Sequence, residues 1–323
     1  MRAVLITRYG PADTMRVGEV EAPHAGPREI RIRVVASGLT PADTYLRAGR
    51  LRESIALRLP HVTGVDAAGV VDEVGAGVTG VAPGDAVFGL TDPARLGGAH
   101  AEHAVLVAWA AKPTAWSWDE AGGAAGNVET ATRVLDRLGV GAGAGRTVLV
   151  HGAAGGVGTV AVQLAAARGA TVVGTASEGN HDLLRSLGAA PTTYGPGLAE
   201  RVGALAPGGV DAVLDCAGGT LPELIGIAGD AARVVTIADL DAAAHGVHLS
   251  HSAPVTEMDG AAVGDADPMA VHGLRAAAAL AAEGRLRVPV AATFPLAEAA
   301  AAHELSESRH ARGKIVLRAG PDA

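Results

Sequence analysis

Residues 147–176 read TVLVHGAAGGVGTVAVQLAAARGATVVGTA. An apolar run is followed by a cluster of four glycines, an amphipathic segment and a second apolar run. This order predicts a strand, a tight turn, a helix and a neighbouring strand. The free N–H groups and the positive dipole end at the start of such a helix favour a bound phosphate.

The glycines of this turn have separate predicted roles. Gly152 and Gly155 are expected to allow a tight turn and a close backbone approach, and Gly158 to let the helix pack against the sheet. The helix start at Gly156–Gly158 then holds the pyrophosphate of a dinucleotide. The alternative is a glycine-rich turn that binds nothing.

The end of the second strand bears on which dinucleotide binds. An NAD site usually has a carboxylate there, about 20 residues after the glycines, for the ribose 2′-OH. Ala176 occupies that place, and Ser177 follows with His181 nearby, so the sequence favours NADP(H). Glu178 keeps NAD open, because a register error of one residue would restore an acid.

The remaining pattern predicts an α/β chain with a β domain and a doubly wound parallel sheet. EIRIRVV (29–35) alternates like a half-buried strand, whereas short apolar strands alternate with helices after Asp119, a candidate helix cap. KIVLR (314–318) is expected to return to the β domain. The predicted domains are 1–118, 119–286 and 287–323.

Composition excludes several classes of protein. The chain has 26 basic and 34 acidic side chains, a net charge of −8, which argues against nucleic acid or an anionic membrane as partner. The single cysteine, Cys216, excludes an internal disulfide and a Cys-rich zinc site. No signal peptide or membrane span is expected, so we predict a soluble cytoplasmic protein.

Neither metal nor nucleophilic catalysis is predicted. A catalytic zinc needs three protein ligands, and the two histidine clusters have spacings that do not converge on one point. We therefore expect the histidines to be solvent-exposed loop residues: His100, His103, His245, His248 and His251. Cys216 ends an apolar strand and is expected to be buried and inert.

Thr40 and Tyr45 stand out in a Gly/Pro-punctuated loop, ASGLTPADTYLRAG (36–49), that leaves a strand. Taken alone, Tyr45 is a half-buried aromatic that either has a function or only packs.

Four segments together resemble the zinc-free quinone oxidoreductases, related to zeta-crystallin, of the medium-chain dehydrogenase/reductase superfamily. They are VVASGLTPADTYLRAG, GVDAAGVVDEVGAGVTGVAPGDAVFG, GAAGGVG and SESRHARGKIVL, in matching order and spacing. The resemblance covers essentially the whole chain. It implies a GroES-like β domain holding both chain ends, a Rossmann domain, a cofactor in the cleft and a homodimer. The zinc-dependent branch has Cys at Thr40 and Gly-His-Glu at Gly64-Val65-Asp66, so the likeness also implies no zinc.

The resemblance further implies cofactor contacts. Thr130 matches a threonine near a cofactor phosphate or the nicotinamide, and Arg309 an arginine that reaches the 2′-phosphate. The family often has lysine near His181, whose charge depends on pH. The whole set of implied contacts comprises Thr130, Ala154, Gly155, Gly156, Val157, Gly158, Gly174, Ser177, His181, Tyr194, Ala217, Ala238 and Arg309.

Two departures concern the substrate. Thr40 replaces a common asparagine, and Asn127 and Glu129 occupy positions that are usually apolar, so they are candidate pocket residues. The alternative is that Glu129 points to solvent.

The resulting hypothesis is an NADPH-dependent, zinc-independent reductase of a quinone or an α,β-unsaturated carbonyl compound, that is, of a small-molecule substrate. Tyr45 and Thr40 would polarise the carbonyl by hydrogen bonds, and Tyr45 or solvent would supply the proton. The alternatives are a biosynthetic tailoring reductase, a non-redox relative of the same fold, and an NADPH-binding structural or regulatory protein.

Overall fold

The computed structural model describes residues 1–50, 52–53, 56–141, 145–252 and 266–320. The chain divides into two compact units. Unit 1 comprises Met1–Gly126, Ala253–Ala266 and Val271–Ala323, and unit 2 comprises Asn127–Ser252 and Asp267–Ala270. The units thus divide after Gly126 and before Val271, whereas the predicted domain boundaries fall after residues 118 and 286.

Unit 1 is a β structure, as predicted. One sheet has the order β15-β16-β3-β5-β6-β8, with β7 also paired to β3, and a smaller sheet has the order β2-β1-β4. The last strand, β16, pairs antiparallel with β3, so the chain does return to the β unit. The strands are β1 Arg2–Ile6, β2 Met15–Glu19, β3 Ile30–Leu39, β4 His61–Val62, β5 Asp66–Val74, β6 Ala86–Leu90, β7 His103–Leu106, β8 Ala108–Ala111, β15 Val290–Pro295 and β16 Lys314–Arg318.

The alternating residues of β3 explain the core of unit 1. Ile30, Ile32 and Val34 are buried, whereas the intervening Arg31 and Arg33 are not. The buried side chains of β3 pack with Leu106 and Leu317 from other strands in one apolar cluster. The helices of unit 1 are α1 Pro41–Ala48, α2 Trp118–Gly122, α8 His272–Ala282 and α9 Ala299–Glu307, with short 3₁₀ turns at Ala12–Thr14, Pro93–Arg95 and Leu296–Glu298.

The segment expected to be a loop after β3 is instead helix α1. Thr40 is its N-cap, Pro41 its first residue and Gly49, at φ 71°, its C-cap. These are the residues that begin and end helices, so the start and stop signals decide the local structure here.

The helix expected to begin at Asp119 has a different cap. Ser117 accepts from the N–H of Glu120 at 3.2 Å, and the Glu120 carboxylate accepts from the N–H of Ser117 at 2.8 Å. Asp119 is therefore not the helix cap, and its carboxylate pairs with Arg318 of β16 at 2.8 Å. The helix also ends at Gly122, and α3 begins separately at Ala125.

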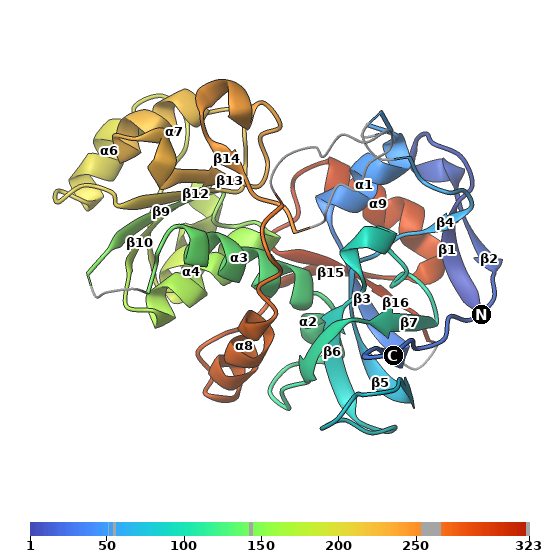
Figure 1. Cartoon of the computed structure of the whole chain (residues 1–323). Helices are drawn as coiled ribbons and strands as arrows, with labels where there is room; N and C mark the ends of the chain where they lie inside the picture. The colour runs from blue at the N-terminus through green and yellow to red at the C-terminus, as the bar shows by residue number, and fades with distance from the viewer. Residues whose placement is uncertain (51, 54–55, 142–144, 253–265, 321–323) are drawn as a thin grey trace. The chain divides into compact units, whose positions relative to one another are not determined.

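Unit 2 is a parallel, doubly wound sheet, which confirms the predicted fold class. Its order is β11-β10-β9-β12-β13-β14, and every neighbouring pair is parallel. Helix α4 packs on β9 and β10 from one face, and α7 packs on β12 and β13 from the other (Figure 1). The elements are β9 Thr147–His151, β10 Thr171–Thr175, β11 Ala189–Thr192, β12 Ala212–Asp215, β13 Val234–Thr236, β14 His248–Leu249, α3 Ala125–Arg137, α4 Gly156–Ala167, α5 His181–Ser186, α6 Leu198–Leu205 and α7 Leu221–Ala228, with 3₁₀ turns at Glu178–Asn180, Ala231–Arg233 and Ala242–His245.

Within the described residues, no helix is both long enough and apolar enough to span a bilayer.

Candidate active site

The strand order of unit 2 reverses between β9 and β12. The chain moves from β9 toward β10 and β11 on one side, and from β12 toward β13 and β14 on the other. The loops that follow β9 and β12 are adjacent, since a Cβ built on Gly152 would lie 3.2 Å from Ala217 Cβ. In open parallel sheets, ligands bind at the carboxyl ends of the strands at this switch point.

The glycine turn lies at this switch point. Gly152 has φ 78°, in the left-handed region that favours glycine, and its carbonyl accepts from Gly155 N at 3.2 Å. Gly155 is the N-cap of α4 without a capping side chain. The first-turn N–H groups of α4 are therefore available to an anion.

Gly158 brings α4 close to this turn. A Cβ there would lie 2.4 Å from the Gly152 carbonyl oxygen and 2.8 Å from Ala153 Cα. At Gly158 the helix thus lies directly against the backbone of the loop, and α4 also packs on the sheet at β9 and β10. The turn and the helix start fit a dinucleotide pyrophosphate, and the predicted residues Ala154 to Gly158 all lie here.

Buried polar contacts hold the start of the turn. The N–H of Gly152 donates to Thr175 Oγ1 at 3.0 Å, and the same oxygen lies 2.9 Å from His151 Nδ1. His151 Nε2 lies 3.3 Å from Thr220 Oγ1. Burial lowers the pKa of His151 despite the opposing charges of Asp215 and Glu223. His151 and Thr175 were not predicted as site residues.

The end of β10 carries no acid. Ala176 is buried and its N–H donates to Thr192 O at 3.0 Å, whereas Ser177 is exposed. Glu178 begins a 3₁₀ turn and is also exposed. Gly174 lies inside β10, where an added Cβ would come within 3.0 Å of Ala153 Cβ and 3.1 Å of Leu184 Cδ1.

Tyr194 lies in the loop after β11, the neighbour of β10, with 60% of its surface exposed. Arg201 holds that loop by donating to the carbonyls of Thr193, Gly195 and Pro196 at 3.0, 3.1 and 2.8 Å. His181 begins α5, and its Nε2 is buried without a hydrogen-bond partner in the described part of the chain. Arg201 was missed because its role is visible only in the folded loop.

The three candidate residues of α3 have different surroundings. Asn127 is buried, and its side-chain nitrogen lies 3.2 Å from the Cβ position of Gly156, so it packs on the start of α4. Glu129 is 3% exposed and pairs with Arg133 at 2.8 Å, so the alternative of a solvent-facing Glu129 is wrong. Thr130 Oγ1 accepts from Arg133 Nη2 at 3.3 Å.

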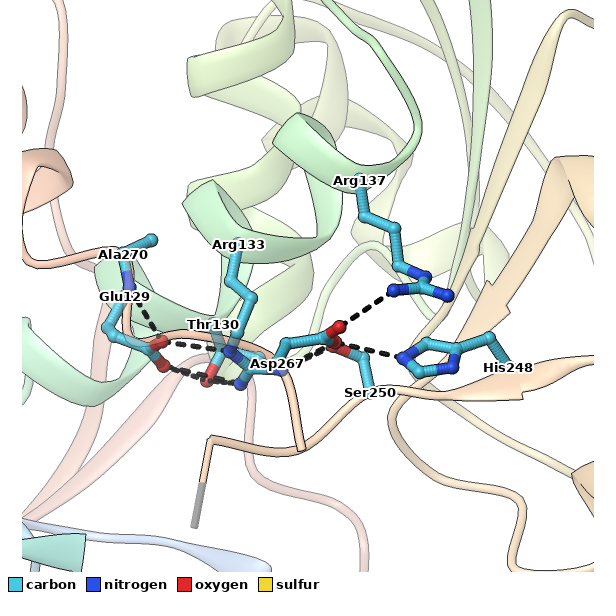
Figure 2. A network of polar contacts seen from close by, with 8 residues as sticks. All are labelled: Glu129, Thr130, Arg133, Arg137, His248, Ser250, Asp267 and Ala270. Carbon is cyan, nitrogen blue, oxygen red and sulfur yellow. Dashed lines mark hydrogen bonds and ion pairs between the residues drawn. The ribbon is translucent and has the colours of Figure 1, made fainter. Parts of the chain in front are cut away.

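Figure 2 shows that this ion pair belongs to a larger network. Asp267 pairs with Arg137 at 2.8 Å and with His248 Nε2 at 2.9 Å, and Ser250 Oγ donates to it at 2.5 Å. The Ala270 N–H donates to Glu129 at 3.2 Å. Burial would raise the pKa of Asp267, but the Ser250 and His248 hydrogen bonds outweigh it and lower that pKa. The network ties residues 267–270 and β14 to α3.

Thr40 and Tyr45 belong to unit 1, on α1. Thr40 donates to Asp43 Oδ2 from its hydroxyl at 2.7 Å and from its backbone N–H at 2.8 Å. The hydroxyl hydrogen is therefore held by a carboxylate. Tyr45 is half-buried, and the Arg50 guanidinium carbon lies 5.2 Å from its ring centroid.

Arg309 also belongs to unit 1, in the exposed turn after α9 with φ 58°. Ala217 and Ala238 are exposed in the loops after β12 and β13 of unit 2.

The expectation that the histidines are solvent-exposed loop residues is wrong for several of them. His100 is fully buried, with Nδ1 2.9 Å from Thr63 Oγ1. His103 and His248 are partly buried and paired with Asp72 and Asp267 at 3.3 and 2.9 Å. Among the residues with described coordinates, no three His, Cys, Asp or Glu side chains are placed to share a metal ion.

Three buried polar side chains, Asp43 of α1, His100 and His303 of α9, lie close enough to interact electrostatically. Burial would raise the pKa of Asp43, but the charge of His100 and the hydrogen bonds from Thr40 hold it below its usual value. His303 of α9 is fully buried and neither ring nitrogen has a hydrogen-bond partner in the described chain. Burial lowers the pKa of His303 to about 3, against the opposing charge of Asp43.

We expect His303 to make the protein less stable in acid. Its pKa falls from 6.5 to about 3 on folding, so the unfolded chain binds more protons and stability is lost as pH falls from 6.5 toward 3. His303→Gln should reduce the slope of unfolding free energy against pH by up to about 1.4 kcal/mol per unit, the value for one proton. Urea unfolding between these pH values measures it. His245→Gln, at an exposed histidine, is the control, and equal slopes in both variants would contradict the prediction.

Gly64-Val65-Asp66 stand where the zinc-dependent branch has Gly-His-Glu. Asp66 is fully buried, and its Oδ2 lies 3.2 Å from Lys314 Nζ of β16. Burial raises the pKa of Asp66, although Lys314 opposes the shift. Asp66 is thus paired with a cation of the chain itself. Zinc does not fit the described residues here.

The fold of the two units and the glycine turn, which fits a dinucleotide pyrophosphate, are those of an oxidoreductase. Residues 26–115 match the family model described as Alcohol dehydrogenase GroES-like domain, and residues 187–317 match that of Zinc-binding dehydrogenase. With the relatives below, these matches show that the chain belongs to the quinone-oxidoreductase-like medium-chain dehydrogenases/reductases. That family implies a nicotinamide cofactor.

Quinone oxidoreductase of Sus scrofa is 29% identical over 98% of this chain and 97% of its own length. The solved quinone oxidoreductase of Coxiella burnetii is 27% identical, with a TM-score of 0.80 over 99% of both chains. A 2-methylene-furan-3-one reductase of Solanum lycopersicum is 37% identical over 58% of this chain and 50% of its own length. Spectinabilin polyketide synthase system protein NorB of Streptomyces orinoci is 40% identical over 63% of this chain, but the match spans only 9% of that protein.

Proposed function

We propose that the protein is an NADPH-dependent, zinc-independent reductase of quinones or α,β-unsaturated carbonyl compounds. The observation that carries the proposal is the glycine turn at the switch point of unit 2, where Gly158 leaves no room for a Cβ beside the Gly152 carbonyl. Such a turn supports a pyrophosphate on the first N–H groups of α4.

The preference for NADPH is supported by the end of β10. A buried alanine and an exposed serine stand where an NAD site usually has a carboxylate. The hydroxyl of Ser177, the half-buried ring of His181 and the exposed ring of Tyr194 suit a 2′-phosphate better than a free 2′-OH.

The proposed chemistry assigns one hydrogen-bond donor to the substrate. When bound, the reduced nicotinamide supplies a hydride to the electrophilic carbon of the substrate. Tyr45 donates a hydrogen bond to the substrate carbonyl oxygen, which becomes negative as the carbon is reduced. Tyr45 or solvent then gives that product its proton. Thr40 is the poorer donor, because Asp43 already holds its hydroxyl hydrogen.

The names of two relatives support the substrate class. The pig protein is named for quinones, and the tomato protein for a ketone conjugated to a methylene group. The match to a polyketide synthase system protein favours a second candidate, a biosynthetic tailoring enone reductase. All of these acceptors have a carbon conjugated to a carbonyl.

Turnover with defined acceptors tests the proposal. The protein is dialysed against EDTA, and consumption of NADPH or NADH is followed with p-benzoquinone, but-3-en-2-one and crotonyl thioester. We expect NADPH to be consumed only with an acceptor and without added metal. The absence of turnover with every acceptor, or activity that returns only with zinc, would overturn the proposal.

A further inference from the structure

Two buried residues end the neighbouring strands β12 and β13. Asp215 is the last residue of β12 and Thr236 the last of β13, and the two are directly paired across the parallel strands. Neither is exposed to solvent. The Thr236 hydroxyl donates to Asp215 Oδ2 at 2.7 Å, which joins the two strand ends through side chains.

Each side chain also holds the loop that follows it. The N–H groups of Ala217 and Gly218 donate to Asp215 Oδ1, both at 3.0 Å. The N–H groups of Ala238 and Asp239 donate to Thr236 Oγ1 at 3.1 and 3.0 Å. The Thr236 oxygen thus accepts two hydrogen bonds and donates one, which fills its capacity.

A third contact joins the loops outside the core. Gly219 N donates to Asp239 Oδ2 at 2.8 Å. Gly218 has φ 74°, and a Cβ there would lie 3.1 Å from Ala238 O, so the two backbones approach closely. Ala217 and Ala238 are exposed, whereas Asp215 and Thr236 beneath them are buried.

We propose that Asp215, Thr236 and Asp239 are positioning residues that fix the two loops against which the nicotinamide ring is held. This inference rests on the proposed function, in which a nicotinamide cofactor occupies the carboxyl edge of the sheet of unit 2. The three residues act on the backbone of the loops and do not contact substrate. They affect the nicotinamide end of the cofactor and leave the adenosine end, beside β10 and β11, unchanged.

The valine variant of Thr236 isolates the hydroxyl. Thr236→Val keeps the shape but leaves two N–H groups and a buried carboxylate oxygen without a partner. We expect the Kd for NADPH to rise about tenfold or more, and the Kd for 2′,5′-ADP, which lacks the nicotinamide, to stay unchanged. If the wild type prefers NADH, then NADH and ADP are the matched pair. Thr236→Ser keeps the hydroxyl and should restore wild-type binding.

Two further variants keep the test independent of folding. Asp239→Ala removes the hydrogen bonds that this half-buried side chain accepts from Gly219 N and, at 3.0 Å, from Asp241 N, and should cause a smaller loss of the same selective kind. Asp230→Ala removes another loop aspartate, which accepts from Ala232 N at 2.9 Å before β13, and should change neither ligand. Amide exchange of residues 217–219 and 238–239 should accelerate in the unliganded Thr236→Val protein.

The outcomes are distinct. Equal weakening of NADPH and 2′,5′-ADP, or no change in either, would overturn the positioning role while leaving the proposed function intact. Failure of the wild type to bind any nicotinamide cofactor would overturn the proposed function and, with it, this inference.

Discussion

Tyr45→Phe is expected to lower kcat for quinone or enone reduction by about 10²–10³-fold. The phenol is the hydrogen-bond donor assigned to the substrate oxygen, since the Thr40 hydroxyl is committed to Asp43 at 2.7 Å. The Arg50 guanidinium carbon lies 5.2 Å from the centroid of the Tyr45 ring, a cation–π contact that helps to hold the ring in place. Steady-state kinetics with NADPH and p-benzoquinone measure the effect.

Two controls separate chemistry from folding in this experiment. Tyr9→Phe removes a phenol of the same unit whose oxygen accepts from Leu57 N at 2.8 Å, and kcat should stay unchanged. Thr40→Val loses a helix cap and should cost about 1 kcal/mol of stability with little loss of kcat. A Tyr45→Phe enzyme with wild-type kcat, or a larger loss in Thr40→Val, would contradict the assignment.

Lys314→Met is expected to destabilise unit 1 by about 3–5 kcal/mol, because it leaves the buried Asp66 carboxylate without its cation. Lys314 Nζ lies 3.2 Å from Asp66 Oδ2, and both side chains are almost completely buried. A carboxyl whose pKa is raised on folding binds its proton more tightly in the native state, so the loss should shrink as pH falls. Guanidinium unfolding at two pH values measures it.

The same strand supplies the control for this second prediction. Arg318→Met removes a cation that pairs with Asp119 at 2.8 Å, but its side chain is 42% exposed. Its expected cost is at most about 1 kcal/mol. Adding Asp66→Asn to Lys314→Met should recover part of the stability. Equal costs for Lys314→Met and Arg318→Met would show that the buried pair is not the source of the effect.

The sequence predicts well where local patterns decide the structure. The alternation of β3 and the strand, glycine turn and helix of residues 147–167 are local, and both are confirmed. Helix α1 was missed, although Thr40, Pro41 and Gly49 carry ordinary start and stop signals. Greater weight on capping residues would have found it.

Long-range contacts explain most of what sequence reasoning missed. Glu129 is buried because Arg133 and the N–H of Ala270 satisfy it, and Ala270 lies 141 residues away. His100 is buried against Thr63. No spacing in the sequence reports such partners, so the sequence alone does not separate polar residues that the fold buries from exposed ones.

Unit 2 is expected to bind NADPH in preference to NADH. Fluorescence titration of the purified protein with each cofactor tests it most directly. We predict a Kd for NADPH at least tenfold lower, a difference of about 1.4 kcal/mol. Equal or tighter binding of NADH would contradict the prediction drawn from Ala176 and Ser177, and no binding of either cofactor would overturn the proposed function.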